Sequence, residues 1–232
     1  MLRAVIFDVD GTVADTERHG HLPAFNAAFA EHRIDIVWSP EEYGQLLHIT
    51  GGRRRIAADL RARGFADGAD ELAAAVHRTK TRLFRERILT HGMPPRPGLV
   101  DLVTGLRAAG IRMAVATTGT RTWVEPLLQR TLGDDVLDVV VTGDDVRQLK
   151  PHPEVYRRAL DGLGLPAASV LAVEDSAVGL QAACAAGVAT VVVTNEYTVG
   201  QEFPGADAVL RGFDGPEPLD ARRCRDLHRQ RH

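Results

Sequence analysis

The chain has 232 residues, of which 44% are hydrophobic and 25% are charged, and its formal net charge at pH 7 is −3. This composition predicts a folded protein with a buried core, either one large domain or a core domain with a smaller companion. The small negative charge argues against wholesale nucleic-acid binding, because it provides no large positive field to attract a polyanion. No segment approaches the ~20 apolar residues that span a bilayer, so no membrane contact is expected.

The cysteines and the first residues predict where the protein resides. Cys184 and Cys224 are the two cysteines of the sequence, too few for a disulfide framework and typical of a reducing compartment. Residues 1–10 contain a short apolar run, but Asp8 and Asp10 interrupt it and the pattern of a signal peptide is missing. We therefore expect a cytoplasmic protein, with no obligate protein partner.

Short runs rich in valine and isoleucine predict strands. In chain order they span 4–7, 111–116, 139–142, 170–173 and 190–193. Near-continuous apolar strands are typical of a parallel sheet covered on both faces. Helical patterns lie among these strands and end at glycines that suit left-handed caps, Gly110, Gly164 and Gly187. The alternation predicts an α/β fold whose core is a doubly wound, Rossmann-like parallel sheet.

The segment 17–92 departs from this alternation. It has helix-like stretches at 22–31, 54–63 and 70–87, but no run rich in valine or isoleucine. It begins soon after the first predicted strand and returns through a proline-rich connector at 93–98. We interpret it as a small α-helical cap inserted into a discontinuous core domain, which comprises residues 1–16 and 93–232.

Two carboxylates follow the first predicted strand, in the sequence Asp8-Val9-Asp10-Gly11-Thr12. In a doubly wound sheet the carboxyl ends of the strands line the ligand crevice, so both acids can face it. The spacing also resembles part of a calcium loop, although an EF-hand loop lies between two helices and needs further ligands at fixed offsets. A purely structural turn is the third interpretation.

Polar residues also follow other predicted strands. Thr117 and Thr118 come after the second strand, Glu174 and Asp175 come after the fourth, and Lys150 precedes a helical pattern. Each has an ordinary structural explanation, such as a helix cap, a surface lysine or acids at a helix N-terminus. Together they predict acids, a hydroxyl and a cation at one edge of one sheet.

This set of residue types fits a magnesium site. Mg²⁺ prefers about six oxygen ligands and is usually held by a few carboxylates, water and a phosphate group. We expect Asp8, Asp175 and the main-chain carbonyl of Asp10 to hold Mg²⁺, with Glu174 beside them.

The same edge fits phosphoryl transfer. Asp8 is the expected nucleophile and would become an aspartyl phosphate. Lys150 would offset the negative charge, and Thr117 would donate a hydrogen bond to a transferring oxygen. Asp10, crowded by Asp8 and phosphate, suits the acid that protonates the leaving oxygen and later acts as a base.

These motifs, in this order, resemble the haloacid-dehalogenase superfamily, and the segment 17–92 resembles its small α-helical cap. Within the superfamily the chain is similar to the CbbY-type phosphatases, which remove phosphate from xylulose-1,5-bisphosphate. Apart from the strand-end motifs above, the likeness lies in Glu17, Ala24-Phe25-Asn26, Glu42-Tyr43, Thr50-Gly51-Gly52 and His77-Arg78-x-Lys80-Thr81, where x is not part of the motif.

The resemblance implies that a small phosphorylated sugar contacts a set of mostly cap residues: Glu17, Gly51, Gly52, Arg53, Arg55, His77, Lys80 and Thr118. Two positions depart from the pattern, since Arg53 stands where lysine is expected and Gly119 replaces a hydroxyl residue. The basic tail from Ala221 matches no part of it.

Several other functions share features of this sequence. β-Phosphoglucomutase shares the core and most of the cap and would transfer phosphate to a sugar. Phosphoglycolate phosphatases and general sugar-phosphate phosphatases are also similar. A signalling receiver domain uses an aspartate, a metal, a hydroxyl and a lysine, but it lacks the second aspartate and the cap. An inactive sugar-phosphate-binding regulator is disfavoured, because Asp8, Asp10, Lys150 and Asp175 are all present.

Overall fold

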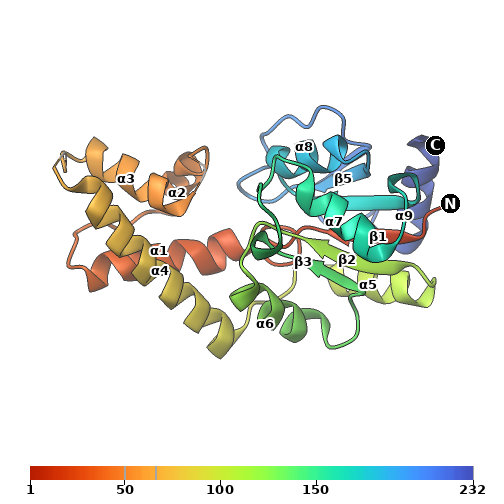
Figure 1. Ribbon diagram of the computed structural model, residues 1–232, viewed down its shortest axis with the longest axis horizontal. Helices are drawn as coiled ribbons and strands as arrows, with labels where there is room; N and C mark the ends of the chain where they lie inside the picture. Colours follow the sequence, from red (N-terminus) through yellow and green to blue (C-terminus); the bar gives the residue numbers. More distant parts are fainter. Residues whose placement is uncertain (50, 66, 232) are drawn as a thin grey trace. The chain divides into compact units, whose positions relative to one another are not determined.

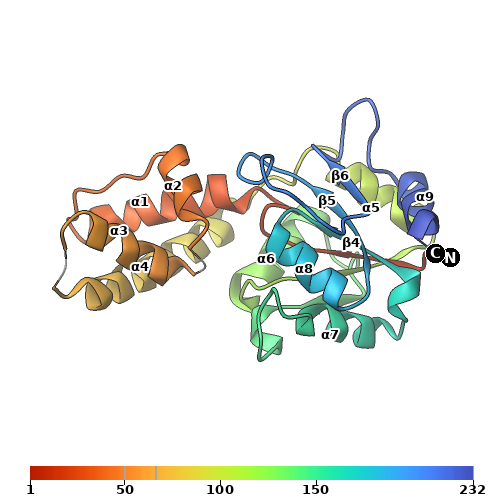
Figure 2. The ribbon, with the colours of Figure 1, turned by 90° about the horizontal axis from the view of Figure 1, so that it is seen from above.

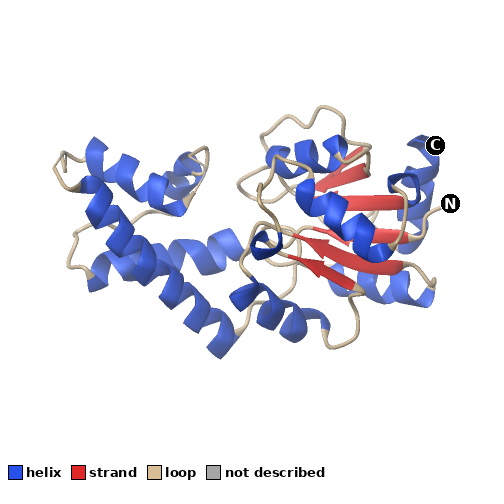
Figure 3. Ribbon diagram, viewed as in Figure 1, coloured by secondary structure: helices blue, strands red, loops and turns tan. Residues whose placement is uncertain are grey.

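The structure is a computed structural model that describes residues 1–49, 51–65 and 67–231. The chain divides into two compact units, one of residues 1–15 with 93–232 and one of residues 16–92. We call them the core unit and the cap unit. Within the described ranges, the strands lie in the core unit, and the cap unit is helical (Figure 3). Thr50, which belongs to the stretch that resembles the CbbY type, lies outside the described residues.

The core unit is built on a parallel sheet with the strand order β3-β2-β1-β4-β5-β6 (Figure 1). Its strands are β1 Ala4–Phe7, β2 Arg112–Ala116, β3 Val139–Val141, β4 Val170–Glu174, β5 Ala189–Val193 and β6 Ala208–Leu210. β1, β4 and β5 are buried along their whole length, which explains their unbroken apolar sequences. The predicted doubly wound parallel sheet is therefore confirmed.

The strand order reverses direction at β1. The chain runs outward from β1 through β2 to β3, and then returns to place β4 on the other side of β1. Phe7 lies beside Val115 of β2 and Val173 of β4, so the three strands end at nearly the same level. Such a reversal opens a crevice at the carboxyl ends of the strands on either side of it. The ends of β1 and β4 are where a ligand is expected.

Helices cover both faces of this sheet (Figure 2). Helices α7 Glu154–Leu163 and α8 Ala177–Ala185 pack on one face, and α5 Leu99–Ala108 and α9 Ala221–Arg231 pack on the other. Helix α6 Arg121–Leu132 connects β2 to β3. Single 3₁₀ turns lie at Gly143–Asp145 and Ala167–Ser169. The predicted helices correspond to α5, α7 and α8.

The basic tail is helix α9, which packs on the core unit. Cys224 and His228 are buried, and His228 Nε2 lies 3.0 Å from the carbonyl oxygen of Ala168. Arg225 donates to the carbonyl oxygen of Ala109 at 3.1 Å, and Arg231 forms an ion pair with Asp207 at 2.7 Å. The tail thus contacts loops that precede β2, β4 and β6.

The cap unit packs four α-helices after a π-helical turn at Glu17–His21: α1 Leu22–Glu31, α2 Pro40–Leu46, α3 Gly52–Ala62 and α4 Ala69–His91. Its centre is a cluster of four buried aromatic rings, Phe25, Phe29, Trp38 and Tyr43. Helix α2 begins with a capping box, in which the side chains of Ser39 and Glu42 each accept the other's main-chain N–H.

None of the described helices is both long and apolar enough to cross a membrane.

Candidate active site

A tight turn carries the two aspartates out of β1. Asp8 N donates to Val173 O at 3.0 Å, which extends the pairing of β1 with β4 by one residue. The chain then folds back on itself, since Gly11 N donates to Ala14 O at 2.9 Å. Gly11 has φ +79°, and a Cβ there would lie 2.2 Å from Asp175 Oδ2. Only glycine fits, so the turn presses its main chain against Asp175.

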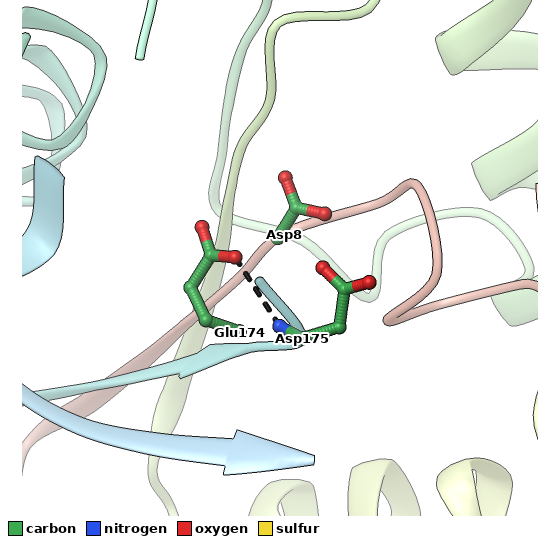
Figure 4. Close-up of side chains that lie close together, drawn as sticks. All are labelled: Asp8, Glu174 and Asp175. Atoms are coloured by element: carbon green, nitrogen blue, oxygen red, sulfur yellow. Dashed lines mark hydrogen bonds between the residues drawn. The ribbon is translucent and has the colours of Figure 1, made fainter. Parts of the chain in front are cut away.

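Three carboxylates gather at the ends of β1 and β4 (Figure 4), and one lysine lies among them. Lys150 Nζ lies 2.6 Å from Asp8 Oδ1 and 2.6 Å from Glu174 Oε1. Asp8, Glu174 and Asp175 are buried, and each offers an oxygen within 4.8 Å of the others. The structure thus brings together four residues that the sequence placed at this edge.

Glu174 is held by several donors. Tyr156 donates its hydroxyl to Glu174 Oε1 at 2.6 Å, and the main-chain N–H of Asp175 donates to Oε2 at 3.2 Å. Gly179 packs directly against this carboxylate, since a Cβ there would lie 1.9 Å from Oε2. These contacts fix the position of the Glu174 carboxylate, and that carboxylate in turn fixes the position of the Lys150 ammonium group.

Burial and mutual repulsion change the acidity of this cluster. Burial raises the pKa of Asp8 to about 7, opposed by the charge of Lys150 and reinforced by Glu174 and Asp10. Burial also raises the pKa of Asp175, with the charges of Asp8 and Glu174 adding to it. Burial alone would lower the pKa of Lys150, but Asp8 and Glu174 raise it above its usual value. Lys150 is therefore a permanent cation, and its single charge leaves the three carboxylates short of positive charge.

The donor set fits a hard divalent cation. It consists of carboxylate oxygens, which are the ligands that Mg²⁺ prefers, and three buried carboxylates meet there beside the single ammonium group of Lys150. Asn195 adds rigidity, since its Nδ2 donates to Asp175 Oδ2 at 2.6 Å. Asp8 and Asp175 are therefore the residues best placed to hold such an ion, with Glu174 beside them.

Thr117 and Thr118, which follow β2, differ in burial. Thr117 is buried, its N–H donates to Val141 O at 3.0 Å, and its Oγ1 accepts from Gly119 N at 3.0 Å. Thr118 is exposed. The structure also explains Gly119, because a Cβ there would lie 2.3 Å from the indole ring of Trp123. The buried tryptophan thus occupies the space that a side chain at residue 119 would need.

Sequence reasoning missed three residues of this region: Tyr156, Asn195 and Arg96. Asn195 follows β5 almost directly, so the strand-end pattern that identified the acids could have found it. Tyr156 lies on the apolar face of α7 and looks like a core residue in the sequence. Arg96 lies in the proline-rich connector, and its guanidinium donates to the carbonyl oxygen of Gly11 at 2.7 Å.

In the cap unit, Glu17 and Arg55 meet at Tyr43. The Tyr43 hydroxyl donates to Glu17 in a short contact and accepts from Arg55 Nη1 at 3.1 Å. Arg55 is buried, lies over the Tyr43 ring at 5.3 Å from its centroid, and donates to Ile49 O at 3.3 Å. Two of the residues that the resemblance singled out are therefore joined through a third.

A second group in the cap unit contains Lys80, His77 and Gly52. Lys80 is buried between the rings of Phe25 and Phe84, and its Nζ lies 2.8 Å from His21 Nδ1. A Cβ at Gly52 would lie 3.0 Å from the His77 ring. Burial lowers the pKa of His77, and the charge of Lys80 lowers it further. Gly51, with φ +94°, is the N-cap residue of α3 and precedes Gly52.

The three consecutive arginines at residues 53–55 differ in burial. Arg53 and Arg54 are exposed and line a cavity of about 320 Å³ with Ala57, Arg61 and Asp70. Arg55 is the member of the run that is buried. Arg53 and Arg55 therefore face different surroundings within the cap unit.

Comparisons with known proteins identify the family of this chain. A family model of the haloacid dehalogenase-like hydrolases matches residues 2–187. The chain is 44% identical over 209 residues to protein CbbY of Rhodobacter capsulatus, covering 89% of this chain and 91% of the relative. It is 42% identical over 228 residues to plasmid-encoded CbbY of Cupriavidus necator, covering 94% of this chain and 89% of the relative.

A solved structure matches the fold as well. A mutant of CbbY from Rhodobacter sphaeroides, crystallised in complex with xylulose-1,5-bisphosphate, is 41% identical and superimposes with a TM-score of 0.80. The match covers 94% of this chain and 98% of that chain. From its strand-end acids, its inserted helical cap and these likenesses together, the chain belongs to the haloacid dehalogenase-like hydrolases and, within them, to the CbbY family.

Proposed function

We propose that this protein is a Mg²⁺-dependent phosphatase that converts xylulose-1,5-bisphosphate to xylulose 5-phosphate. The observation that carries the proposal is the buried cluster at the ends of β1 and β4, in which Lys150 lies 2.6 Å from both Asp8 and Glu174, beside Asp175. The substrate comes from the likeness to a CbbY that was crystallised with this bisphosphate.

Asp8 is the nucleophile in this proposal. One of its carboxylate oxygens forms a bond to phosphorus while the bond from phosphorus to the sugar oxygen breaks, which leaves an aspartyl phosphate. Asp10 gives its proton to the departing sugar oxygen. Lys150, held by Asp8 and Glu174, neutralises part of the charge on the phosphoryl oxygens, and Thr117 donates a hydrogen bond to one of them.

Hydrolysis of the aspartyl phosphate reverses the role of Asp10. Asp10, now ionised, takes a proton from a water molecule as its oxygen attacks phosphorus. The bond between phosphorus and the Asp8 oxygen breaks, which restores the carboxylate and releases inorganic phosphate. Asp10 is again protonated and ready for the next ester.

Mg²⁺ would be held by Asp8, Asp175 and the main-chain carbonyl of Asp10, with Glu174 beside them, and would supply charge neutralisation and alignment of the phosphoryl group. Asn195 orients Asp175 through a hydrogen bond of 2.6 Å. Tyr156 and Lys150 keep Glu174 in place from the other side. These hydrogen bonds hold Asp175 and Glu174 in place, which supports a preorganised site.

The cap unit supplies the second part of the substrate site in this proposal. A bisphosphate carries a distal phosphate, which needs cations or main-chain donors of its own. The candidates in the cap unit are Arg53, Arg55, Lys80 and the N-terminus of α3 at Gly51 and Gly52. The resemblance adds Glu17 and His77 of the cap unit and Thr118 of the core unit as candidates for contact with the sugar. The contact between Tyr43 and Arg55 would hold the guanidinium ready for the phosphate.

A screen of phosphorylated sugars with Mg²⁺, ranked by kcat/KM, tests the proposal. Xylulose-1,5-bisphosphate should rank first and yield inorganic phosphate, whereas a mutase would yield an isomeric sugar phosphate. Asp8→Asn should abolish turnover, because an amide is not a nucleophile for this reaction. Turnover by a well-folded Asp8→Asn variant would contradict the covalent mechanism. If another phosphate ester ranked above xylulose-1,5-bisphosphate, that ester would be the preferred substrate. The proposed covalent mechanism would still stand.

We also propose that the protein works in the cytoplasm, since Cys184 and Cys224 are both free thiols in the structure.

A further inference from the structure

Arg96, in the connector that follows the cap unit, lies beside the candidate active site. Its Nη1 donates to Gly11 O at 2.7 Å and to Val193 O at 2.9 Å, and its Nη2 donates to Thr194 O at 2.6 Å. The guanidinium also lies over the ring of Phe213, 5.4 Å from its centroid. These contacts engage both the edge and the face of a planar group, so they fix its position and orientation.

The contacts of Arg96 close a ring around Asp175. On one side, Gly11 presses against Asp175 so closely that a Cβ would lie 2.2 Å from Oδ2. On the other side, Asn195 donates its Nδ2 to the same Oδ2 at 2.6 Å. Arg96 joins the two sides, because it binds the carbonyl of Gly11 and that of Thr194, the neighbour of Asn195. Arg96 therefore adds a side-chain link between Gly11 and the residue next to Asn195, and Gly11 and Asn195 already pack against each other.

The main chain attaches the same turn to the connector at further points. Arg96 N donates to Val13 O at 3.0 Å, and Ala14 forms an antiparallel bridge with Pro95. The turn that carries Asp10 and Gly11 is therefore bound to the connector by main chain and by side chain. The main-chain bonds would survive a substitution of Arg96, so such a substitution would loosen the turn without detaching it.

We propose that Arg96 is a positioning residue that holds the Asp10–Gly11 turn against Asp175 and so fixes the spacing of the oxygens that bind the divalent cation. The proposal rests on the function proposed above. Arg96 acts through the main chain and does not touch the substrate. Loss of a residue that orients metal ligands typically lowers metal affinity or activity by about 10- to 100-fold.

Hydrogen bonding and charge at Arg96 have opposite effects on cation binding. The positive charge of Arg96 near Asp175 repels a divalent cation and so weakens its binding. The three hydrogen bonds of Arg96 strengthen the binding of that cation, because they hold its ligands in place. Lysine keeps the charge but cannot direct donors to all three carbonyls, because its ammonium is compact and lacks the planar fork. Arg96→Lys therefore separates the two effects.

The test measures Mn²⁺ affinity by calorimetry for the full chain, for Arg96→Lys and for Arg96→Gln. Arg112 is a matched control, because it also donates to a carbonyl, Leu163 O at 2.7 Å, but lies at the opposite end of the sheet. We expect both Arg96 variants to bind Mn²⁺ about 10- to 100-fold more weakly, and Arg112→Gln to bind like wild type. For the bisphosphate, kcat should fall by a similar factor while KM changes less.

Chemical rescue adds a readout that a merely structural role would not move. Arg96→Ala should regain Mn²⁺ affinity and turnover when guanidinium ion is added at concentrations below those that unfold the protein, and ammonium ion should not restore them. Wild-type Mn²⁺ affinity in Arg96→Lys, or equal losses in the Arg112 control, would overturn the proposal. If wild type fails to hydrolyse the bisphosphate, the proposed substrate is wrong, while the Mn²⁺ affinities still decide the role of Arg96.

Discussion

Lys150 Nζ lies 2.6 Å from Asp8 Oδ1, and both side chains are at least nine-tenths buried. A buried carboxylate that loses its cation stays uncompensated, which typically costs about 3–5 kcal/mol of stability. Lys150→Met should therefore lower the free energy of unfolding by about this amount and reduce phosphate release by roughly 10²- to 10³-fold, as the loss of an electrostatic stabiliser typically does.

Urea unfolding and kcat check this expectation. Arg158→Met is the control, because Arg158 pairs with Glu154 on an exposed helix surface and such pairs contribute about 0.3–0.5 kcal/mol. Equal losses of unfolding free energy and of kcat in the two variants would show that the buried Lys150 pair contributes no more than an exposed ion pair.

The metal-free protein should lose a pH-dependent part of its stability between about pH 4 and about pH 7, because the pKa of Asp8 rises from 3.8 to about 7 on folding. A carboxyl with a raised folded pKa contributes stability below its unfolded pKa, and that contribution is lost as pH rises through the folded value. Urea unfolding in chelator should show this loss in wild type, less of it in Asp8→Asn, and its removal by Mg²⁺. Identical pH dependence in both proteins would contradict the prediction.

Asp10→Asn should depend on the leaving group. The variant loses proton transfer, which contributes about 10²- to 10⁴-fold, so phosphorylation by a sugar phosphate should slow by that factor. A nitrophenyl phosphate needs no proton on its leaving oxygen and should suffer less. Burst kinetics of the phosphorylation step compare the two esters. Equal slowing with both would show that Asp10 is not the general acid.

Arg55→Ala should lower kcat/KM more for a bisphosphate than for a monophosphate that lacks the distal group. Because Arg55 is buried against Tyr43, its removal also disturbs packing, so the ratio of the two constants is the quantity to compare. Tyr43→Phe is the control, since it removes the hydroxyl that joins Glu17 to Arg55 but keeps the arginine charge. An unchanged ratio in Arg55→Ala would mean that the distal phosphate binds elsewhere.

Gly119→Ser should destabilise the protein, although a hydroxyl residue is expected at this position in the family. The new Cβ would lie 2.3 Å from the Trp123 ring, and overpacking of a core typically costs about 1–3 kcal/mol. Gly200→Ser is the control, because no atom lies within 4 Å of its Cβ position. Equal thermal midpoints for the two variants would show that Trp123 yields to the side chain.

The sequence predicted the strands that are apolar along their length and missed β6. Residues 208–210 form a three-residue edge strand in which Val209 is 52% exposed, so they lack the unbroken apolar run of a buried strand. Helix α9 was missed for a similar reason, because its polar residues leave little more than Cys224 and His228 to mark a buried face.

The candidate active site shows the same contrast between residues that a local sequence pattern marks and residues that it does not. Asp8, Thr117 and Asp175 could be predicted because a strand end delivers them to the crevice. Arg96 could not, since its partners Gly11 and Thr194 lie 85 and 98 residues away in the sequence and meet it only after folding. In the cap unit, three consecutive arginines look alike in the sequence, and packing against Tyr43 decides that Arg55 is the buried one.

The strand order has a consequence for how the protein is made. β1 is synthesised before the other strands of this sheet, yet it lies in the middle of the sheet, and its partner β4 begins only at Val170. Closing a loop of that length costs entropy before any pairing is gained, so contacts of this kind form slowly. The nascent chain therefore carries Asp8 with one edge of β1 unpaired until β4 has been synthesised.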